Sequence, residues 1–327
     1  MSRSVAIVGA GQIGFAAATA FAEAGWDVRV LARSQPEWHF EGVRFEPYVI
    51  GVSDAPIADA IIDTIALDDE DVRRYDPCTF GRLVVVSSAS VYCDAEGWTL
   101  DEAAQNGFPN FVHAITESQA TVTPGPETYS TRKMRMENAA RDCFRERATI
   151  LRPCAIHGPW SRHPREWWFV KRLLDGRRNI PLAHRGMAQF QTTAARLIGK
   201  AALSAVVKSM AGTFNLADDN SPTVHCIDLA IAEALGQKPN FVLFDCDSTG
   251  AVGRTPWSIP APMVVSGSKA NETFDLTRLP YSFAVNRVVD WLADRNPPDW
   301  RQAFPQLAAY PWDLFDYEAE DRFLNSG

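Results

Sequence analysis

Three polar side chains in this 327-residue chain have the types and spacing needed for proton transfer. Tyr129 and Lys133 are four residues apart, which places a phenol and an ammonium on one face of a helix. Ser88 adds a hydroxyl at the end of an apolar run that is typical of a buried strand. Beside a hydride carrier, these groups could move a proton while the hydride moves. Without a nucleotide-binding scaffold, Tyr-x-x-x-Lys is only a common helix pattern.

The first 32 residues have the pattern of such a scaffold. A β-branched run at 4–8 predicts a buried parallel strand, and a glycine-rich turn follows it. An alanine-rich helix is expected over 15–24 and a second strand over 27–32. The order strand, glycine turn, helix, strand is the context in which Gly-x-Gly-x-x-Gly indicates dinucleotide binding.

Each glycine of the turn has an expected role. Gly9 allows the tight turn, Gly11 lets the backbone approach a pyrophosphate, and Gly14 lets the helix pack closely on the strand. Gln12 and Ile13 complete the predicted cofactor contacts, because the N–H groups of a helix N-terminus face the phosphates. The alternative is a glycine-rich turn without a ligand.

Strands and helices continue to alternate, which predicts an α/β fold with a Rossmann-type, doubly wound parallel sheet. We expect a dinucleotide-binding domain over 1–155 and a smaller mixed α/β substrate-binding region over 156–327, parts of which return to the sheet. The further strands of the sheet are expected at 43–49, 60–66, 82–88 and 148–152, with a helix at 128–147 and a short acidic helix after 68.

Ligands of such sheets lie beyond the carboxyl ends of the strands. Ser88 and Ala66 each end a predicted strand, and Pro153 directly follows another. We therefore expect Ser88 to face the same crevice as the glycine turn, with Ala66 and Pro153 among the cofactor contacts.

Composition is that of a globular enzyme that can form a full core, with 46% hydrophobic and 22% charged residues. The formal net charge of −8 disfavours nucleic-acid binding, and no apolar run is long enough to span a membrane. The six cysteines show no Cys-x-x-Cys pair or metal-ligand spacing, and no secretory signal precedes the first strand. These features predict a cytoplasmic protein with reduced, packed cysteines and no bound metal.

Four motifs occur in order, namely Gly9-Ala-Gly-Gln-Ile-Gly14, Ser87-Ser-Ala-Ser-Val-Tyr92, Tyr129-x-x-x-Lys133 and Leu151-Arg-Pro-Cys-Ala-Ile-His-Gly-Pro159. With them the chain resembles the extended short-chain dehydrogenase/reductase superfamily, specifically its NAD-dependent epimerase/dehydratase group. The resemblance covers most of the chain. It is specific for the superfamily and weak for the substrate.

The resemblance implies roles for the polar groups. Tyr129 would be the general acid/base, with its pKa lowered by Lys133, and Lys133 would also hold the nicotinamide ribose. Ser88 would hold the substrate oxygen. Ser90 is a further candidate for substrate contact, and the alternative for both Ser87 and Ser90 is hydrogen bonding at the strand end.

The second strand ends in Leu31-Ala-Arg33-Ser34, without the acid that holds a ribose 2′-hydroxyl in NAD-binding proteins. Arg33 could instead pair with a 2′-phosphate, which favours NADP(H) over NAD(H). The alternative is a solvated surface arginine.

A tryptophan-rich segment follows the last motif, in the region that the resemblance assigns to the substrate. Trp160, Trp167 and Trp168 are predicted to line the substrate site. The alternative places Trp167 and Trp168 in the core, at the start of an amphipathic helix that runs to Leu174.

Several features depart from the family pattern. Cys93 replaces a usual glycine and His157 a usual tyrosine, and either a reactive or a packed role is open for each. An insertion at 98–127 predicts a surface loop with one short helix and a possible lid over the crevice. The segment 67–81 is short for a dimer-interface helix, so homodimerisation is left open.

The sequence therefore predicts an NAD(P)-dependent oxidoreductase that transfers hydride between nicotinamide and a carbonyl or hydroxyl carbon of a small organic substrate. A nucleotide-sugar epimerase or dehydratase with transient oxidation is the first alternative, although the segment 189–195 lacks that group's usual aspartate and basic residue. The second alternative is a non-catalytic NADP-binding regulator, which would not need Tyr129, Lys133 and Ser88.

Overall fold

The computed structural model describes residues 3–245 and 250–326, so the predicted packing of Cys246 lies outside it. A seven-stranded sheet has the order β10-β6-β5-β4-β1-β2-β3, and every neighbouring pair is parallel. This contains the doubly wound order 3-2-1-4-5-6, which confirms the predicted fold class. The strands are β1 (Ser4–Val8), β2 (Asp27–Ala32), β3 (Val43–Pro47), β4 (Ala60–Asp63), β5 (Arg82–Val86), β6 (Ala148–Pro153) and β10 (Gly212–Leu216).

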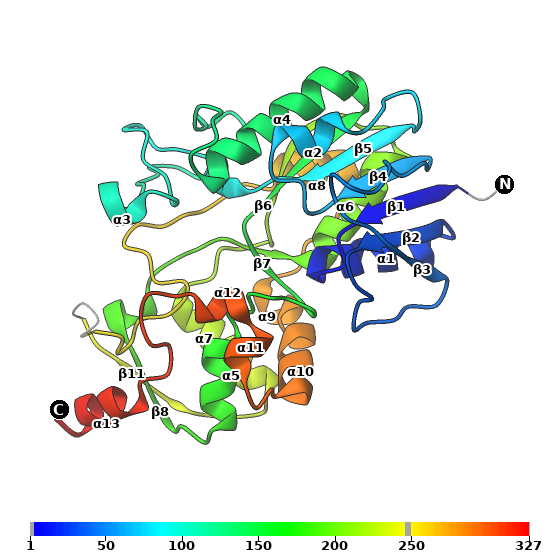
Figure 1. Cartoon of the computed structure of the whole chain (residues 1–327). Helices are drawn as coiled ribbons and strands as arrows, with labels where there is room; N and C mark the ends of the chain where they lie inside the picture. Colours follow the sequence, from blue (N-terminus) through cyan, green and yellow to red (C-terminus); the bar gives the residue numbers. More distant parts are fainter. Residues whose placement is uncertain (1–2, 246–249, 327) are drawn as a thin grey trace.

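Both faces of this sheet are buried under helices (Figure 1). On β1, Val5 and Ile7 belong to one core and Ala6 and Val8 to another, because successive side chains of a strand point to opposite faces. The first core includes residues of α1 (Gln12–Glu23), α6 (Ala195–Val207) and α8 (Ser268–Phe274). The second includes residues of α2 (Asp69–Arg73) and α4 (Tyr129–Phe144).

Three of the strands end two or three residues earlier than predicted. After β4, the carboxylate Oδ1 of Asp63 accepts the N–H groups of Ile65 and Ala66 at 2.9 and 2.8 Å, which turns the chain. After β5, the Ser88 hydroxyl accepts the N–H of Ser90 at 3.1 Å and caps a short 3₁₀ turn. Side-chain hydrogen bonds to the backbone thus end strands whose apolar composition would extend them.

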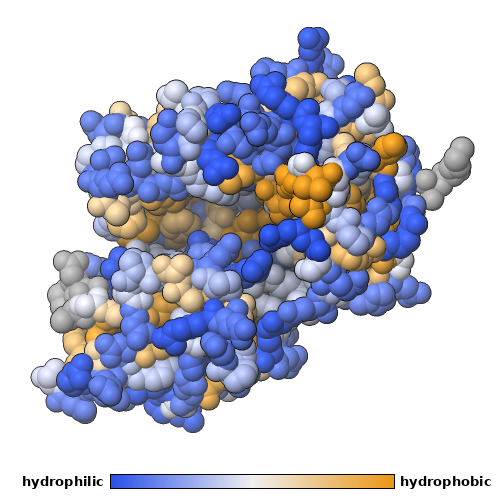
Figure 2. Space-filling view, in the orientation of Figure 1, coloured by the Kyte–Doolittle hydropathy of each residue, from blue (hydrophilic) through white to orange (hydrophobic). Residues whose placement is uncertain are grey.

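The remaining elements form a second lobe with its own core (Figure 1). Its helices are α5 (Trp167–Leu174), α7 (Val224–Ala234), α9 (Tyr281–Ala284), α10 (Asn286–Arg295), α11 (Trp300–Ala303), α12 (Pro305–Ala308) and α13 (Tyr317–Ser326). Its strands β8 (Asn179–Leu182) and β11 (Asn240–Leu243) pair in parallel, and β7 (Ala155–His157) pairs with β9 (Thr192–Ala194) between the lobes. The space-filling view shows a hollow between the two lobes (Figure 2).

The C-terminal segment packs on the body, since Trp300, Phe304, Leu307 and Leu314 are buried in the second core. The insertion carries one short helix, α3 (Ala103–Asn106), as predicted. Within the described residues, no helix is long and apolar enough to cross a membrane.

A buried carboxylate of α7 gives the second lobe a pH-dependent stability. Asp228 is fully buried, and its Oδ1 has no hydrogen-bond partner among the described residues. Burial raises the pKa of Asp228 to about 7, although the nearby His225 opposes the rise. Between about pH 4 and 7 the folded state therefore keeps a proton that the unfolded state releases, so stability falls as the pH rises and the cost is complete above about pH 7.

We expect Asp228→Asn to be more stable than the native chain at pH 8, by on the order of 1–3 kcal/mol, and to lose this advantage near pH 4. Urea unfolding at both pH values measures the difference. Asp290→Asn, an exposed change on α10, is the control. If Asp228→Asn were more stable than the native chain by the same amount at both pH values, the loss of stability at high pH would not come from ionisation of Asp228.

Candidate active site

The glycine turn has the geometry that dinucleotide binding requires. Gly9 has a φ of +107°, and a Cβ there would lie 2.2 Å from Thr64 Oγ1. A Cβ on Gly14 would lie 2.0 Å from the carbonyl oxygen of Gly9, so the helix and the turn touch backbone to backbone. At Gly11, by contrast, no described atom lies within 4 Å of an added Cβ. Gly9 and Gly14 are thus fixed by packing, and Gly11 opens toward a ligand.

Gln12 and Ile13 are the first two residues of α1, directly after Gly11 as N-cap. In the part of the chain described, no side chain caps this helix end. The first N–H groups of α1 therefore face outward at its positive end, as an anion site requires.

A cleft of 1180 Å³ opens beside the glycine turn and contains residues of both lobes. From the sheet lobe, Gly9, Gly11 and Arg33 line it, and from the other lobe the segment 291–306 contributes. Trp160 also lines it and packs on both Phe15 of α1 and Trp291 of α10. Of the described residues that form its lining, none is Ser88, Tyr129 or Lys133. The cleft extends from the glycine turn to the end of β2, which is the adenosine side of a Rossmann site.

The segment after β2, which also lines this cleft, makes a hydrogen bond and an ion pair that the sequence did not indicate. Trp38 donates its indole N–H to the carbonyl of Ala10 in the glycine turn at 2.8 Å. Glu37 forms an ion pair with Arg295 at the end of α10, which joins the lobes across the cleft. Arg33 is exposed and lines the cleft, which fits both a phosphate contact and a solvated surface arginine, while the carboxylate of Glu37 is already paired with Arg295.

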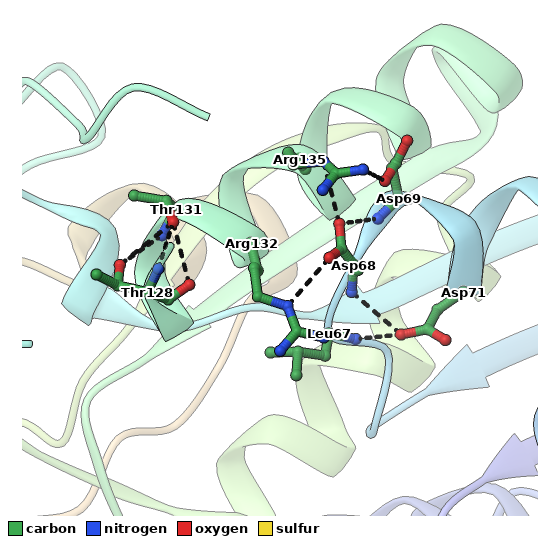
Figure 3. Close-up of polar contacts among 8 residues, drawn as sticks. All are labelled: Leu67, Asp68, Asp69, Asp71, Thr128, Thr131, Arg132 and Arg135. Atoms are coloured by element: carbon green, nitrogen blue, oxygen red, sulfur yellow. Dashed lines mark hydrogen bonds and ion pairs between the residues drawn. The ribbon is translucent and has the colours of Figure 1, made fainter. Parts of the chain in front are cut away.

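Helix α4 starts at a fixed position at the edge of the sheet. Thr128 and Thr131 form a reciprocal capping box, with N–H to hydroxyl distances of 2.9 and 3.2 Å (Figure 3). Asp101, from the insertion, accepts the N–H of Ser130 at 2.7 Å. These three contacts define where Tyr129, the first residue of the helix, lies.

Ion pairs hold α4 against α2. The carboxylate of Asp68 lies 3.0 Å from Arg132 Nε and 3.2 Å from Arg135 Nε, and Asp69 also pairs with Arg135 (Figure 3). Asp71 closes the N-terminus of α2 by accepting the N–H groups of Leu67 and Asp68 at 2.8 and 3.1 Å. The acidic residues 68–71 therefore cap the N-terminus of α2 and hold α4 through ion pairs.

Lys133 lies one turn below Tyr129 and is buried. Its Nζ donates to the carbonyls of Ala66 and Val86 at 2.6 and 2.8 Å, at the ends of β4 and β5. Burial lowers the pKa of Lys133 to about 8, against the opposing effect of Asp63, Glu137 and Asp71. Ala66, a predicted cofactor contact, is thus buried with its carbonyl bound to Lys133.

Tyr129 and Ser88 are brought together as predicted. Burial raises the pKa of Tyr129 to about 12, Asp101 adds to the rise, and a hydrogen bond with Ser88 opposes it. Water at the exposed 47% of the tyrosine surface limits this rise. The Lys133 ammonium lies 5.6 Å from the centre of the Tyr129 ring. The sequence predicted that Lys133 would lower the pKa of Tyr129. In this structure the pKa is raised instead, because burial and Asp101 outweigh the hydrogen bond with Ser88.

The other two serines of the motif have structural partners. Ser87 donates to Glu137 at 2.6 Å, and Glu137 also accepts from Arg152 Nε and Nη2 at 2.8 and 2.6 Å. Ser90 accepts a hydrogen bond from the Ser130 hydroxyl at 2.8 Å. Since Glu137 is one turn after Lys133, this buried network fixes the face of α4 that carries the candidate catalytic groups. The strand-end interpretation therefore describes Ser87 and Ser90 better than substrate contact.

Two of the three tryptophan predictions are wrong. Trp167 and Trp168 are buried in the core of the second lobe, where Trp167 packs on Phe304 and Trp168 on Phe169. They face inward because both begin the amphipathic helix α5. Trp160 lines the large cleft instead, with its ring 5.8 Å from that of Trp291.

The departures from the family pattern are packed residues. Cys93 is buried, and burial raises the pKa of its thiol, so it is not an activated thiolate. His157 is buried in β7, with Nε2 at 2.8 Å from Asp218. Pro153 is buried at the end of β6, opposite Leu216 of β10.

The fold and these positions define a doubly wound, dinucleotide-binding type of architecture. No protein-family model matches the chain, and no curated protein matches it in sequence. Solved structures do match it. A UDP-glucose 4-epimerase aligns with a TM-score of 0.68 and 16% identity, over 90% of this chain and 98% of the other. A UDP-glucuronic acid 4-epimerase from Bacillus cereus, in complex with NAD, gives 0.68 and 13% over 91% and 99%.

A dTDP-glucose 4,6-dehydratase from Bacillus anthracis str. Ames, in complex with NAD, aligns with a TM-score of 0.66 and 15% identity, over 92% of this chain and 100% of the other. Identities this low show a shared fold. The shared fold is the one that the sequence resemblance predicts.

Proposed function

We propose that this protein is an NAD(P)-dependent oxidoreductase that moves hydride between nicotinamide and a carbonyl or hydroxyl carbon of a small organic substrate. The observation that supports this most is the meeting of Tyr129, Ser88 and Lys133 at the carboxyl ends of β4 and β5. The glycine turn after β1 lies at the same edge, since β1 pairs in parallel with β4.

In this proposal Tyr129 carries the proton and Ser88 holds the substrate oxygen. The bound nicotinamide ring supplies or accepts the hydride. Burial and Asp101 raise the pKa of Tyr129, which keeps its hydroxyl protonated and able to donate to a carbonyl oxygen, although the raised pKa also makes it a weaker acid. To act as a base in the reverse direction, it needs additional positive charge near its oxygen, and the Lys133 ammonium is the nearest candidate on its own helix.

The choice between NAD and NADP rests on opposing observations. Arg33 lines the adenosine side of the cleft, which supports NADP. Two of the three structural neighbours described above were solved with NAD, which favours NAD. We propose that the cofactor is a nicotinamide dinucleotide. Replacement of Arg33 tests whether it carries the 2′-phosphate that distinguishes NADP from NAD.

We expect Arg33→Ala to weaken NADPH binding about tenfold and NADH binding less than about threefold, because a charge-assisted hydrogen bond to a phosphate contributes about 1.5–3 kcal/mol. Fluorescence titration of both reduced dinucleotides measures this. Arg44→Ala is the control, since Arg44 pairs with Asp27 at the amino end of the same strands. Equal losses for both dinucleotides would remove the argument for NADP.

A second candidate function is epimerisation or dehydration of a nucleotide sugar, with transient oxidation. It is favoured by the structural neighbours, which include two epimerases and a dehydratase of such sugars. Against it, Gln189 takes a structural role, donating to the carbonyl of Ser221 at 3.0 Å. Net NADPH or NADH oxidation with a panel of carbonyl compounds supports the oxidoreductase. Product formation from UDP- or dTDP-sugars without net absorbance change at 340 nm supports the epimerase or dehydratase.

A further inference from the structure

A second cavity, of 230 Å³, lies against helix α1 and shares no residue with the lining of the large cleft. Its walls come from α1, from the segment 157–159 after β6, from the start of α6 and from the α9–α10 region. Among the described residues it is distinct from the large cleft, and it adjoins the predicted dinucleotide contacts at Gln12, which directly follows Gly11 of the glycine turn.

The charged groups of this cavity are mainly cationic. Arg196, Lys200 and Arg287 line it, against the single acid Glu23. In the described parts of the chain, none of the three cations forms an ion pair or a side-chain hydrogen bond. Three cations from two different elements thus face one small space whose lining holds a single acid, Glu23, with which none of them pairs.

The N-terminus of α6 faces the same space. This helix has 13 residues and begins at Ala195, and its N-cap residue Ala194 provides no side-chain cap within the described structure. Ala194, Ala195 and Arg196 all line the cavity. The Asp218 carboxylate accepts the N–H of Ala194 at 2.9 Å, and the N–H groups of the first turn of α6 lie at its positive end, where a further anion is favoured.

His157 supplies an independent indication of a ligand. The residue is 2% exposed and lines the cavity, and its Nδ1 has no hydrogen-bond partner among the described residues. Its Nε2 is held by Asp218, which also accepts from Thr192 and from the N–H of Ala194. A buried ring nitrogen without a partner is costly, and a ligand oxygen in the cavity would satisfy it.

The groups around His157 favour its charged form. Burial and Arg196 lower the pKa of His157, but Asp218 and Glu166 outweigh them and raise it. Tyr281, which packs on the ring, donates its hydroxyl to Glu166 at 3.1 Å. When both ring nitrogens are protonated, Nδ1 is a donor that needs an acceptor. Gln12 contributes a carboxamide whose oxygen is also buried and unpartnered in the described structure, and turning the amide would present its NH₂.

We propose that this cavity is a binding site for a phosphate group, as inorganic phosphate or on a small phosphorylated metabolite, held by Arg196, Arg287, His157 and the N-terminus of α6. The site goes beyond the proposed function, because it lies outside the dinucleotide cleft. Its volume suits a small oxyanion and leaves no room for a dinucleotide.

Calorimetric titration of the full chain with inorganic phosphate tests the proposal, first without and then with a saturating concentration of NADH. We expect Arg196→Gln combined with Arg287→Gln to weaken phosphate binding at least about tenfold, since two charge-assisted contacts are lost. Lys238→Gln, the loss of one positive charge on the loop before β11, should change it less than about twofold. Melting temperatures of the variants show whether each is folded.

Persistence of phosphate binding in the NADH-saturated protein, with the expected losses, supports a separate site. Displacement of phosphate by NADH would assign the anion to the dinucleotide's own pyrophosphate site and overturn the proposal. Absence of phosphate binding, or binding that the double variant leaves unchanged, would overturn it as well.

Discussion

Replacement of Tyr129 by Phe should reduce kcat by at least about 100-fold while leaving dinucleotide binding within about twofold. The change removes one hydroxyl, and positioned general acid/base groups contribute about 10²–10⁴ in rate. Binding should survive because the ring, the glycine turn and the contacts of Lys133 to Ala66 and Val86 are untouched. The measurement is steady-state turnover with the best carbonyl substrate, together with fluorescence titration of NADPH and NADH.

The matched control is Tyr317→Phe, which removes a hydroxyl that donates to Asp175 at the far end of the second lobe. It should leave kcat unchanged. Near-full activity of Tyr129→Phe would exclude the tyrosine as the acid/base. Dinucleotide binding without turnover in the native chain, on any carbonyl or sugar substrate, would instead favour the non-catalytic regulator.

Replacement of Glu320 by Ala should destabilise the second lobe by about 3–5 kcal/mol, because it leaves a buried arginine without its counter-ion. Arg172 of α5 is 1% exposed and donates to Glu320 of α13 through Nε and Nη2 at 3.1 and 2.5 Å. The guanidinium also lies 3.4 Å from the centre of the Trp168 ring and cannot turn to solvent without disrupting the core. Urea unfolding followed by tryptophan fluorescence measures the loss.

Glu318→Ala is the control on the same helix. The Glu318 side chain is 91% exposed, and its one ion pair among the described residues, with the exposed Arg322, is long at 3.8 Å. Its effect should be below about 1 kcal/mol. Equal losses for the two variants would show that the Arg172–Glu320 pair does not hold α13 in place. Tyr129-dependent activity measured below the unfolding transition should be unaffected, because α13 lies in the other lobe, away from α4 (Figure 1).

Much of the sheet lobe is predictable because its signals are local. A run of β-branched residues such as Ser4–Val8 can only be buried on both faces, and the observed strand has those bounds. Gly9 and Gly14 lie where a Cβ would collide with the neighbouring backbone or side chain, so the glycine spacing encodes the turn. Tyr129 and Lys133 share a helix face by periodicity alone.

Contacts between distant segments were not predictable. The pair Glu37–Arg295 joins residues 258 positions apart, and nothing in either local sequence selects the partner. Asp101 reaches the start of α4 from an insertion whose path the sequence does not specify. Trp167 and Trp168 have the composition of a binding surface, and only the packing of α5 against α10 and α7 places them inside.

The sequence by itself determined the architecture, the glycine turn and the candidate proton-transfer residues, because strand, turn and helix patterns depend on neighbours a few positions away. The tertiary structure decided how those residues behave. Burial and Asp101 raise the pKa of Tyr129, burial lowers that of Lys133, and Ser87 joins a buried ion-pair network with Glu137. Desolvation and long-range charge depend on which segments meet in space, and that is set only when the two lobes are packed.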